Sequence, residues 1–130
     1  MQIELLEIDF NSEEAIYMQL RNQIILGIAA SRLQDGDTLP SVRQMAECIG
    51  INMHTVNKAY AVLRKEGIVS IDRRKGAVIC IDSNKLEEMR QNLYIILAKG
   101  RCHNISRQEA HRLLDEIYDM WEQSPEDPLE

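Results

Sequence analysis

The chain has 130 residues, of which 45% are hydrophobic, so it can form one compact domain or a small domain with a helical appendage. No apolar run reaches the ~18–20 residues of a membrane span, and the acidic N-terminus lacks the basic start of a signal peptide. The formal net charge is −6, yet residues 38–81 hold seven basic and three acidic side chains between two acidic flanks, which keeps a nucleic-acid partner open.

The first third of the chain predicts one amphipathic helix. Residues 3–10 give a weak signal for a short strand or an extended arm. Asn11 and Ser12 are good N-cap residues for a helix that follows them. We therefore expect a helix over about residues 13–31. Its apolar residues recur at the spacing of one helical face, at Ile16, Leu20, Ile24, Ile25 and Ile28.

Two shorter helices are expected next. Ser41 and Gln44 can form a capping box, so the second helix begins there, and Gly50 ends it. Asn52 can cap a third helix, which ends at Gly67, where a left-handed residue is easiest to place. Only a few residues separate the second helix from the third, as in a helix-turn-helix.

The pattern then changes from helical spacing to β-strands. Residues 68–71 and 78–81 are rich in β-forming side chains, and the segment 72–76 between them is basic and ends in glycine. This predicts a hairpin with a positively charged tip. Residues 1–81 therefore predict a winged helix-turn-helix, and the fold class is mainly α with a small β-hairpin wing.

The remaining residues, 82–130, predict a C-terminal two-helix hairpin. Residues 82–84 are expected to open its first helix and Gly100 to close it. Ser106 and Glu109 form a second capping box, which starts the last helix. The polar C-terminus contains two prolines and is expected to be frayed.

The three cysteines, Cys48, Cys80 and Cys102, are odd in number and widely spaced, which argues against a disulfide framework or a zinc ribbon. A reducing cytoplasm is the expected compartment. Cys48 and Cys80 lie among apolar residues and are expected to be buried. Cys102 with His103 and His111 is a weak pattern for a metal, and we expect no metal site and no cofactor.

Three blocks of residues occur in a fixed order and spacing. They are Ala15-Ile16-Tyr17-x-Gln19-Leu20, Gly36-Asp37-x-Leu39-Pro40-Ser41-Val42-Arg43-x-x-Ala46 and Thr55-Val56-x-x-Ala59-Tyr60-x-x-Leu63-x-x-Glu66-Gly67. Over roughly residues 12–81 the chain resembles the DNA-binding domain of the GntR family of bacterial regulators. Its short, helical C-terminal part resembles the YtrA-like branch of that family.

The resemblance implies a sequence-specific DNA-binding transcription regulator, a repressor rather than an enzyme, acting as a homodimer on a pseudo-palindromic operator. The expected partners are double-stranded DNA and a second copy of the chain, with no membrane. A small-molecule effector stays open, because no residue identifies one. The alternative is a winged-helix module that binds another protein and never binds DNA.

The expected DNA contacts come from three places. The start of the second helix can hold a phosphate, the front of the third helix meets base edges in the major groove, and the basic hairpin tip lies on the backbone or in the minor groove. The resemblance assigns Arg43, His54, Thr55, Lys75 and Gly76 to these places. The full expected set is Ser41, Arg43, Asn52, His54, Thr55, Asn57, Lys58, Arg73, Arg74, Lys75 and Gly76.

Simpler interpretations stand beside some of these assignments. Asn52 can act only as a helix cap, and Arg64 and Lys65 can act only as complements to the helix dipole. Many relatives carry arginine where this chain has Met53 and Asn57. Arginine suits guanine and asparagine suits adenine, so we expect a different operator.

The apolar stripes of the C-terminal hairpin predict a dimer interface. Two isolated amphipathic helices make a poor core, whereas a symmetric copy buries both stripes and presents two recognition helices to a palindrome. The alternative is that the stripes pack back onto the first helix. The expected dimer residues are Leu86, Met89, Leu93, Ile96, Leu97, Leu113, Leu114, Ile117 and Trp121.

Overall fold

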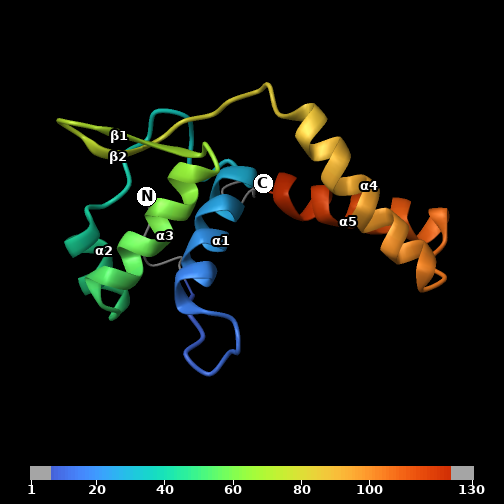
Figure 1. Cartoon of the computed structure of the whole chain (residues 1–130), viewed down its shortest axis with the longest axis horizontal. Coiled ribbons are helices and arrows are strands. Elements are labelled where there is room, and N and C mark those ends of the chain that lie inside the picture. Colours follow the sequence, from blue (N-terminus) through green and yellow to red (C-terminus); the bar gives the residue numbers. More distant parts are fainter. Residues whose placement is uncertain (1–6, 124–130) are drawn as a thin grey trace. The chain divides into compact units, whose positions relative to one another are not determined.

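A computed structural model describes residues 7–123 of the chain. The chain divides into two compact units after Ile81. The first holds α1 (Ile16–Ala29), α2 (Val42–Ile49), α3 (Met53–Lys65), β1 (Val69–Asp72) and β2 (Gly76–Ile79), and the second holds α4 (Leu86–Cys102) and α5 (Arg107–Glu122) (Figure 1). The prediction of a mainly α fold with a small β-hairpin wing is confirmed.

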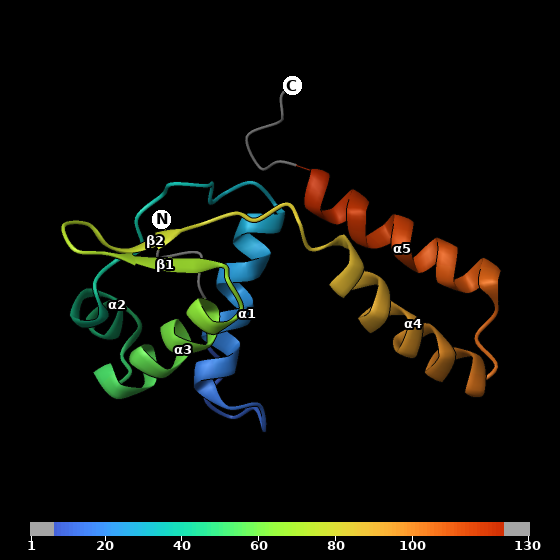
Figure 2. The ribbon, with the colours of Figure 1, turned by 45° about the horizontal axis from the view of Figure 1, so that its top comes forward.

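The first unit encloses one hydrophobic core between its three helices and its hairpin, and α1, α3 and the hairpin lie together in both ribbon views (Figure 2). Within this unit, α1, α2, α3 and β2 each supply at least one of the largest fully buried side chains. These are Leu20, Ile24, Met45, Leu63, Ile79 and Val56. Full burial of such a side chain stabilises a fold by roughly 1.5–3 kcal/mol, so this unit carries a complete core of its own.

The predicted starts of α2 and α3 are confirmed. The Ser41 hydroxyl accepts the Gln44 backbone N–H at 3.1 Å, and the Gln44 side chain accepts the Ser41 N–H at 3.1 Å. The Asn52 side chain accepts the Thr55 N–H at 2.8 Å and so caps α3. Gly67 follows the end of α3 in the left-handed region, with φ of 79°.

The predicted start of α1 is wrong. The helix begins at Ile16 and not at about residue 13, and Asn11 and Ser12 do not cap it. The Ser12 hydroxyl instead accepts the Glu14 N–H at 3.0 Å, which closes a local turn before the helix. Residues 7–9 are neither helix nor strand, and the rest of the expected arm lies outside the described residues.

A glutamine within α1 holds the segment that precedes the helix. Gln19 is only 8% exposed. Its side chain accepts the Asp9 N–H at 2.8 Å and donates to the Asp9 carbonyl at 3.0 Å and the Glu14 carbonyl at 2.9 Å. These bonds hold the segment before α1 against the helix, and they satisfy a buried amide that would otherwise be costly.

Strand β2 is hydrogen-bonded along both of its edges. β1 and β2 pair antiparallel, with Asp72 opposite Gly76 at the tip. The other edge of β2 bonds to the segment before α2, where Leu39 N–H donates to the Ala77 carbonyl and Ile79 N–H donates to the Asp37 carbonyl, both at 2.8 Å. The wing is therefore anchored to the chain that leads into α2, which fixes it relative to the helix-turn-helix.

Two cysteines depart from the prediction. Cys48 and Cys80 were expected to be buried, but both are exposed, as is Cys102. Cys48 lies next to half-buried Ile49, and Cys80 follows buried Ile79. Neighbours in sequence point about 100° apart on a helix and to opposite faces of a strand, so an apolar neighbourhood in the sequence did not imply burial.

The second unit is a hairpin of two helices that lie side by side and run in opposite directions (Figures 1 and 2). The predicted capping box at its turn is confirmed, with Ser106 and Glu109 bonded to each other's backbone N–H at 3.1 and 3.0 Å. Among residues 7–123 no helix combines the length and the hydropathy needed to cross a membrane.

The predicted limits of α4 are wrong at both ends. Asp82 accepts the Asn84 N–H at 2.9 Å in a turn of its own, and α4 begins at Leu86 without a side-chain cap. Gly100 does not end the helix, which continues to Cys102. A Cβ at Gly100 would lie 3.8 Å from Ile105, so this glycine faces the returning chain inside the helix.

Candidate nucleic-acid interface

The start of α2 is fastened to α3 from inside the fold. The Tyr60 hydroxyl donates to the Pro40 carbonyl at 2.7 Å, which links the middle of α3 to the residue before the capping box. Burial raises the pKa of Tyr60 far above its ordinary value, so the phenol stays neutral and keeps its donor proton. Ser41 and Arg43 are thereby presented from a rigid helix start, and both are exposed.

α3 has one buried face and one exposed face, as a recognition helix needs. Val56, Ala59, Tyr60 and Leu63 point into the core. His54 and Asn57 lie on the exposed side, as the sequence analysis expected. The front of α3 is therefore open to a ligand while its back is fixed.

The cap of α3 ties up two of the predicted contact residues. The Asn52 side chain accepts both the Thr55 N–H at 2.8 Å and the Thr55 hydroxyl at 3.1 Å. Asn52 is therefore the cap of α3, and its expected contact with DNA stays a prediction. Thr55 is half-buried, and its hydroxyl already has a partner.

Lys58 lies on the flank of α3 that faces α1. Its Nζ is 4.4 Å from the centroid of the Tyr17 ring, within the range of a cation–π contact. The ammonium is thus held beside α1 rather than extended from the middle of the exposed face.

The wing tip is a tight turn built around one carboxylate. Asp72 accepts the backbone N–H of Arg74 at 2.7 Å and of Lys75 at 2.9 Å. These two backbone bonds, the one from Lys75 first, lower the pKa of Asp72. Gly76 completes the turn with φ of 84°. The side chains of Arg73, Arg74 and Lys75 are exposed, and none forms an ion pair with a described residue.

A groove brings the three expected contact regions together. It has a volume of about 320 Å³ and lies between the start of α2, the exposed side of α3 and the wing. No acidic side chain lines it. The lining residues are Pro40, Ser41, Val42, Asn57, Tyr60, Ala61, Arg64, Ile71, Gly76 and Ala77.

One arginine of this groove, Arg64, was not among the expected contact residues. Arg64 was interpreted as a complement to the helix dipole, but it lines the groove with Asn57. The spacing held the signal, because residues seven apart lie on the same helical face. Lys65, the next residue, is exposed but does not line the groove.

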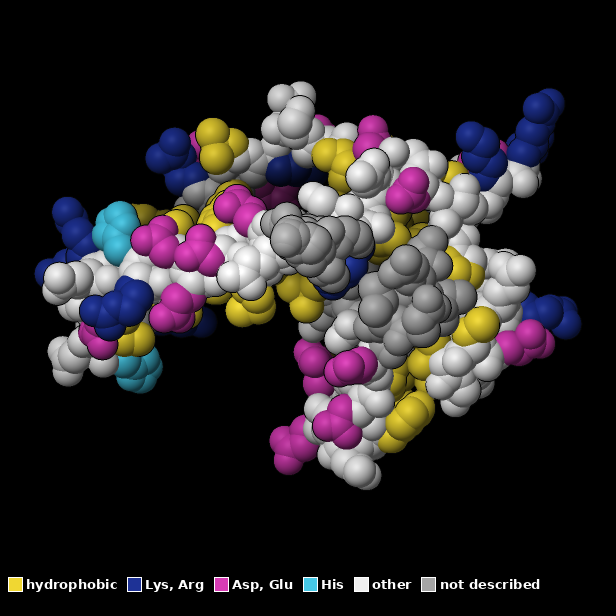
Figure 3. Space-filling view, turned by 180° about the vertical axis from the view of Figure 1, so that it is seen from behind, with side chains coloured by type: hydrophobic (Ala, Val, Ile, Leu, Met, Phe, Trp, Pro, Cys, Tyr) yellow, Lys and Arg dark blue, Asp and Glu magenta, His cyan; other side chains and the backbone are white. Residues whose placement is uncertain are grey.

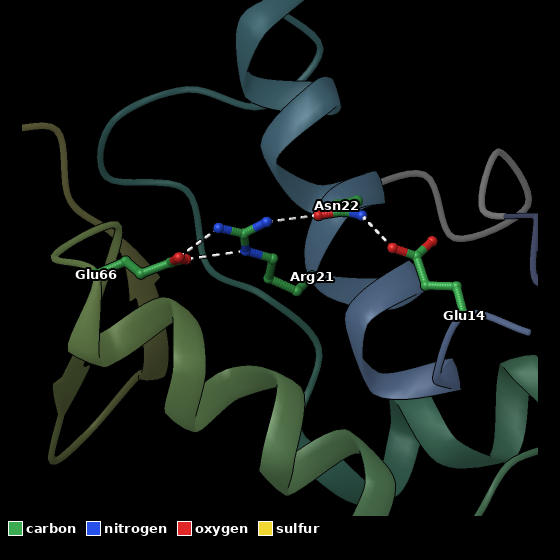
Figure 4. Close-up of polar contacts among 4 residues, drawn as sticks. All are labelled: Glu14, Arg21, Asn22 and Glu66. Carbon is green, nitrogen blue, oxygen red and sulfur yellow. Dashed lines mark hydrogen bonds and ion pairs between the residues drawn. The ribbon is translucent and has the colours of Figure 1, made fainter. Parts of the chain in front are cut away.

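A polar chain on the other side of α3 braces this arrangement (Figure 4). Arg21 of α1 forms a two-pronged ion pair with Glu66, which follows α3 directly. Arg21 also donates to Asn22 at 2.6 Å, and Asn22 donates to Glu14 at 3.3 Å. The bond to Glu66 raises the pKa of Arg21, and the pair fixes the point where α3 passes into the wing.

Comparisons with known proteins agree on the family. The profile of the family described as "Bacterial regulatory proteins, gntR family" matches residues 12–79. The HTH-type transcriptional repressor YtrA of Bacillus subtilis is 32% identical over 114 residues, which cover 88% of this chain and 80% of YtrA.

Two solved structures extend the likeness to the fold. A transcriptional antiterminator from Listeria monocytogenes has a TM-score of 0.76 and 28% identity, covering 95% of this chain and 96% of that one. YtrA from Sulfolobus acidocaldarius, a GntR-family transcription factor, has a TM-score of 0.61 and 39% identity, covering 72% of this chain and 97% of that one. The chain therefore belongs to the GntR family of bacterial regulatory proteins and is a YtrA-like transcription regulator rather than an enzyme.

Proposed function

We propose that this regulator binds double-stranded DNA as a homodimer on a pseudo-palindromic operator in the cytoplasm and represses transcription from it. The observation that carries the proposal is the groove between α2, α3 and the wing. It joins a helix start, the exposed side of a helix and a basic hairpin, and its lining holds no acidic side chain. A polyanion fits such a surface even though the whole chain is acidic.

In this proposal each part of the surface has its own task. Asn57 and His54 face base edges in the major groove, where asparagine suits adenine. Ser41 and Arg43 bind phosphates or an adjacent base from the start of α2. Arg64 binds the backbone strand that passes along the groove.

The wing contributes affinity rather than sequence selection. Arg73, Arg74 and Lys75 lie on the backbone or in the minor groove, and Gly76 lets the chain approach closely. Each phosphate contact releases counterions, so binding weakens as salt rises. Lys58 and the capped pair of Asn52 and Thr55 contribute from the flank and through the backbone at the start of α3.

The homodimer part of the proposal rests on the second unit. Neither α4 nor α5 contains a buried residue. Of the nine expected dimer residues, Ile117 and Trp121 are half-buried and the others are exposed. A second copy would cover those side chains, and repression would follow from two winged helices occupying one promoter site.

Selection of bound duplexes from a random pool tests the proposal. We expect an enriched, two-fold symmetric sequence whose binding weakens steeply as salt rises. A winged helix that serves only as a protein-binding module predicts no enrichment and no salt-dependent binding to duplex. Enrichment of a single half-site without symmetry would support DNA binding and contradict the dimer on a palindrome.

A further inference from the structure

The α4–α5 hairpin is divided into a basic end and an acidic end. We call residues 99–112, around the turn, the turn end, and residues 82–98 with 113–122 the open end. The turn end holds four basic and one acidic side chain, whereas the open end holds two basic and seven acidic ones. Figure 3 shows Lys, Arg and His side chains around the turn and Asp and Glu side chains further along the hairpin.

An apolar groove runs between the two helices on one face of the hairpin. It has a volume of about 350 Å³, and its apolar lining comes from Leu93, Leu97, Ile105, Ala110 and Leu114. Arg101, Arg107 and His111 also line it, all from the turn end. Among the described residues neither arginine forms an ion pair.

We infer that a second copy of this chain covers this groove with its hairpin antiparallel to the first, so that each turn end meets the other open end. The inference rests on the proposed homodimer and adds its geometry. A parallel pair would place basic end on basic end and acidic end on acidic end. An antiparallel pair places opposite charges together at both ends.

Two arginines of α4 give this geometry a matched test. Arg90 and Arg101 are eleven residues apart, close to three helical turns, so they lie on the same side of α4 about 16 Å apart. In the antiparallel pair Arg101 faces the acidic open end of the second copy. Arg90 faces its basic turn end. The same charge reversal should therefore weaken the dimer at Arg101 but not at Arg90, whose ion pair with Glu87 lies within α4.

The experiment is sedimentation equilibrium of the full chain and of the variants Arg101→Glu and Arg90→Glu. We expect Arg101→Glu to raise the dimer dissociation constant about tenfold, because two symmetric contacts are reversed. Arg90→Glu should leave it unchanged or lower it severalfold. Raising salt from about 0.05 to about 0.5 M should weaken the wild-type dimer, since the charges that meet attract each other.

A cross-link gives the orientation independently of charge. In a Cys48→Ser, Cys80→Ser chain, the Cys102 pair of an antiparallel dimer would lie roughly 24 Å apart, at opposite ends of the paired α4 helices. A short bis-maleimide should therefore fail to join the two copies. With Cys102→Ser and Tyr94→Cys added, the new pair lies near the two-fold axis at the middle of α4 and should be joined.

The outcomes separate this inference from the proposed function. A wild-type chain that stays monomeric at all concentrations would overturn the homodimer itself. A dimer that strengthens with salt, loses affinity on Arg90→Glu rather than on Arg101→Glu, and cross-links through Cys102 would overturn only the antiparallel geometry. The dimer would then stand with its hairpins parallel.

Discussion

The winged helix and the C-terminal hairpin place their apolar residues in opposite ways. In the winged helix, Leu20, Ile24 and Leu63 are completely buried beneath polar helix faces. In the hairpin, Leu86 and Tyr94 are 70% and 73% exposed, and neither helix buries any residue. A unit of three helices and a braced β-hairpin closes a core, whereas two helices alone leave both apolar stripes without a buried residue.

The two units therefore differ in the source of their stability. The winged helix needs only its own chain. If a second copy covers the hairpin, as proposed, the stability of the hairpin should depend on protein concentration. The proposed DNA-binding surface then rests on a complete core, and the proposed dimer surface on a core that two copies share.

The largest expected effect comes from opening the complete core. Leu63→Ala removes a fully buried side chain and should lower the free energy of unfolding by about 2–5 kcal/mol, at every protein concentration. Thermal and denaturant unfolding at several concentrations measure this. Leu97→Ala is the control. It changes an exposed residue of the hairpin, so its effect on the free energy of unfolding should depend on protein concentration. Equal behaviour of the two variants would erase the contrast between the units.

The next effect comes from placing a charge in the apolar groove of the α4–α5 hairpin. Leu93→Asp puts an unpaired carboxylate into the groove that a second copy would cover, which should cost about 3 kcal/mol, or over a hundredfold in the dimer dissociation constant. Sedimentation equilibrium measures it, and the winged helix should keep its unfolding midpoint. A variant that dimerises like the wild type would remove α4 from the interface.

A third effect concerns the affinity for DNA and leaves the stability of the fold unchanged. Arg43→Ala should weaken operator binding by about 1–3 kcal/mol if the guanidinium contacts a base, since a bidentate contact has that worth. Titration against the selected duplex measures it. Arg32→Ala changes an exposed arginine of the same unit that is not among the expected contact residues, and it should leave affinity unchanged. Equal losses from both variants would show a general charge effect.

A fourth effect appears in the salt dependence. Neutralising Arg73, Arg74 and Lys75 to glutamine should flatten the plot of log affinity against log salt by up to about one unit for each lost phosphate contact. The sequence preference should change little, because these contacts carry no base information. An unchanged slope would show that the wing does not lie on the backbone.

The smallest expected effect is at the tie between α3 and α2. Tyr60→Phe removes the bond to Pro40 and should cost about 0.5–1.5 kcal/mol of stability. Burial raises the pKa of Tyr60, so the unfolded phenol ionises first and the wild type should lose stability as pH rises above about 10. The phenylalanine variant should lose less over that range. Parallel pH curves for the two proteins would contradict this account.

Features that depend on residues three or four apart were predictable from the sequence. The capping boxes at Ser41 and Ser106, the Asn52 cap and the hairpin itself were confirmed. Each is a contact within one helical turn or one hairpin, where neighbouring side chains determine the backbone conformation. The bounds of the second strand were wrong, because it runs over Gly76–Ile79 rather than residues 78–81, and Gly76 pairs with Asp72 instead of lying in the loop between the strands. The family blocks extended this local information to the whole winged helix, and the family was confirmed.

Features that depend on distant residues were decided only by the tertiary structure. The segment before α1 is held by Gln19, whose side chain bonds to Asp9 ten residues away. Arg64 lines a groove that exists only because the wing folds against α3. Local patterns in the sequence were thus enough to predict the helices, the caps of α2, α3 and α5 and the family. Packing across the chain determined how the segment before α1 is held, which side chains are buried and which residues share a groove, because those depend on partners that local patterns do not contain.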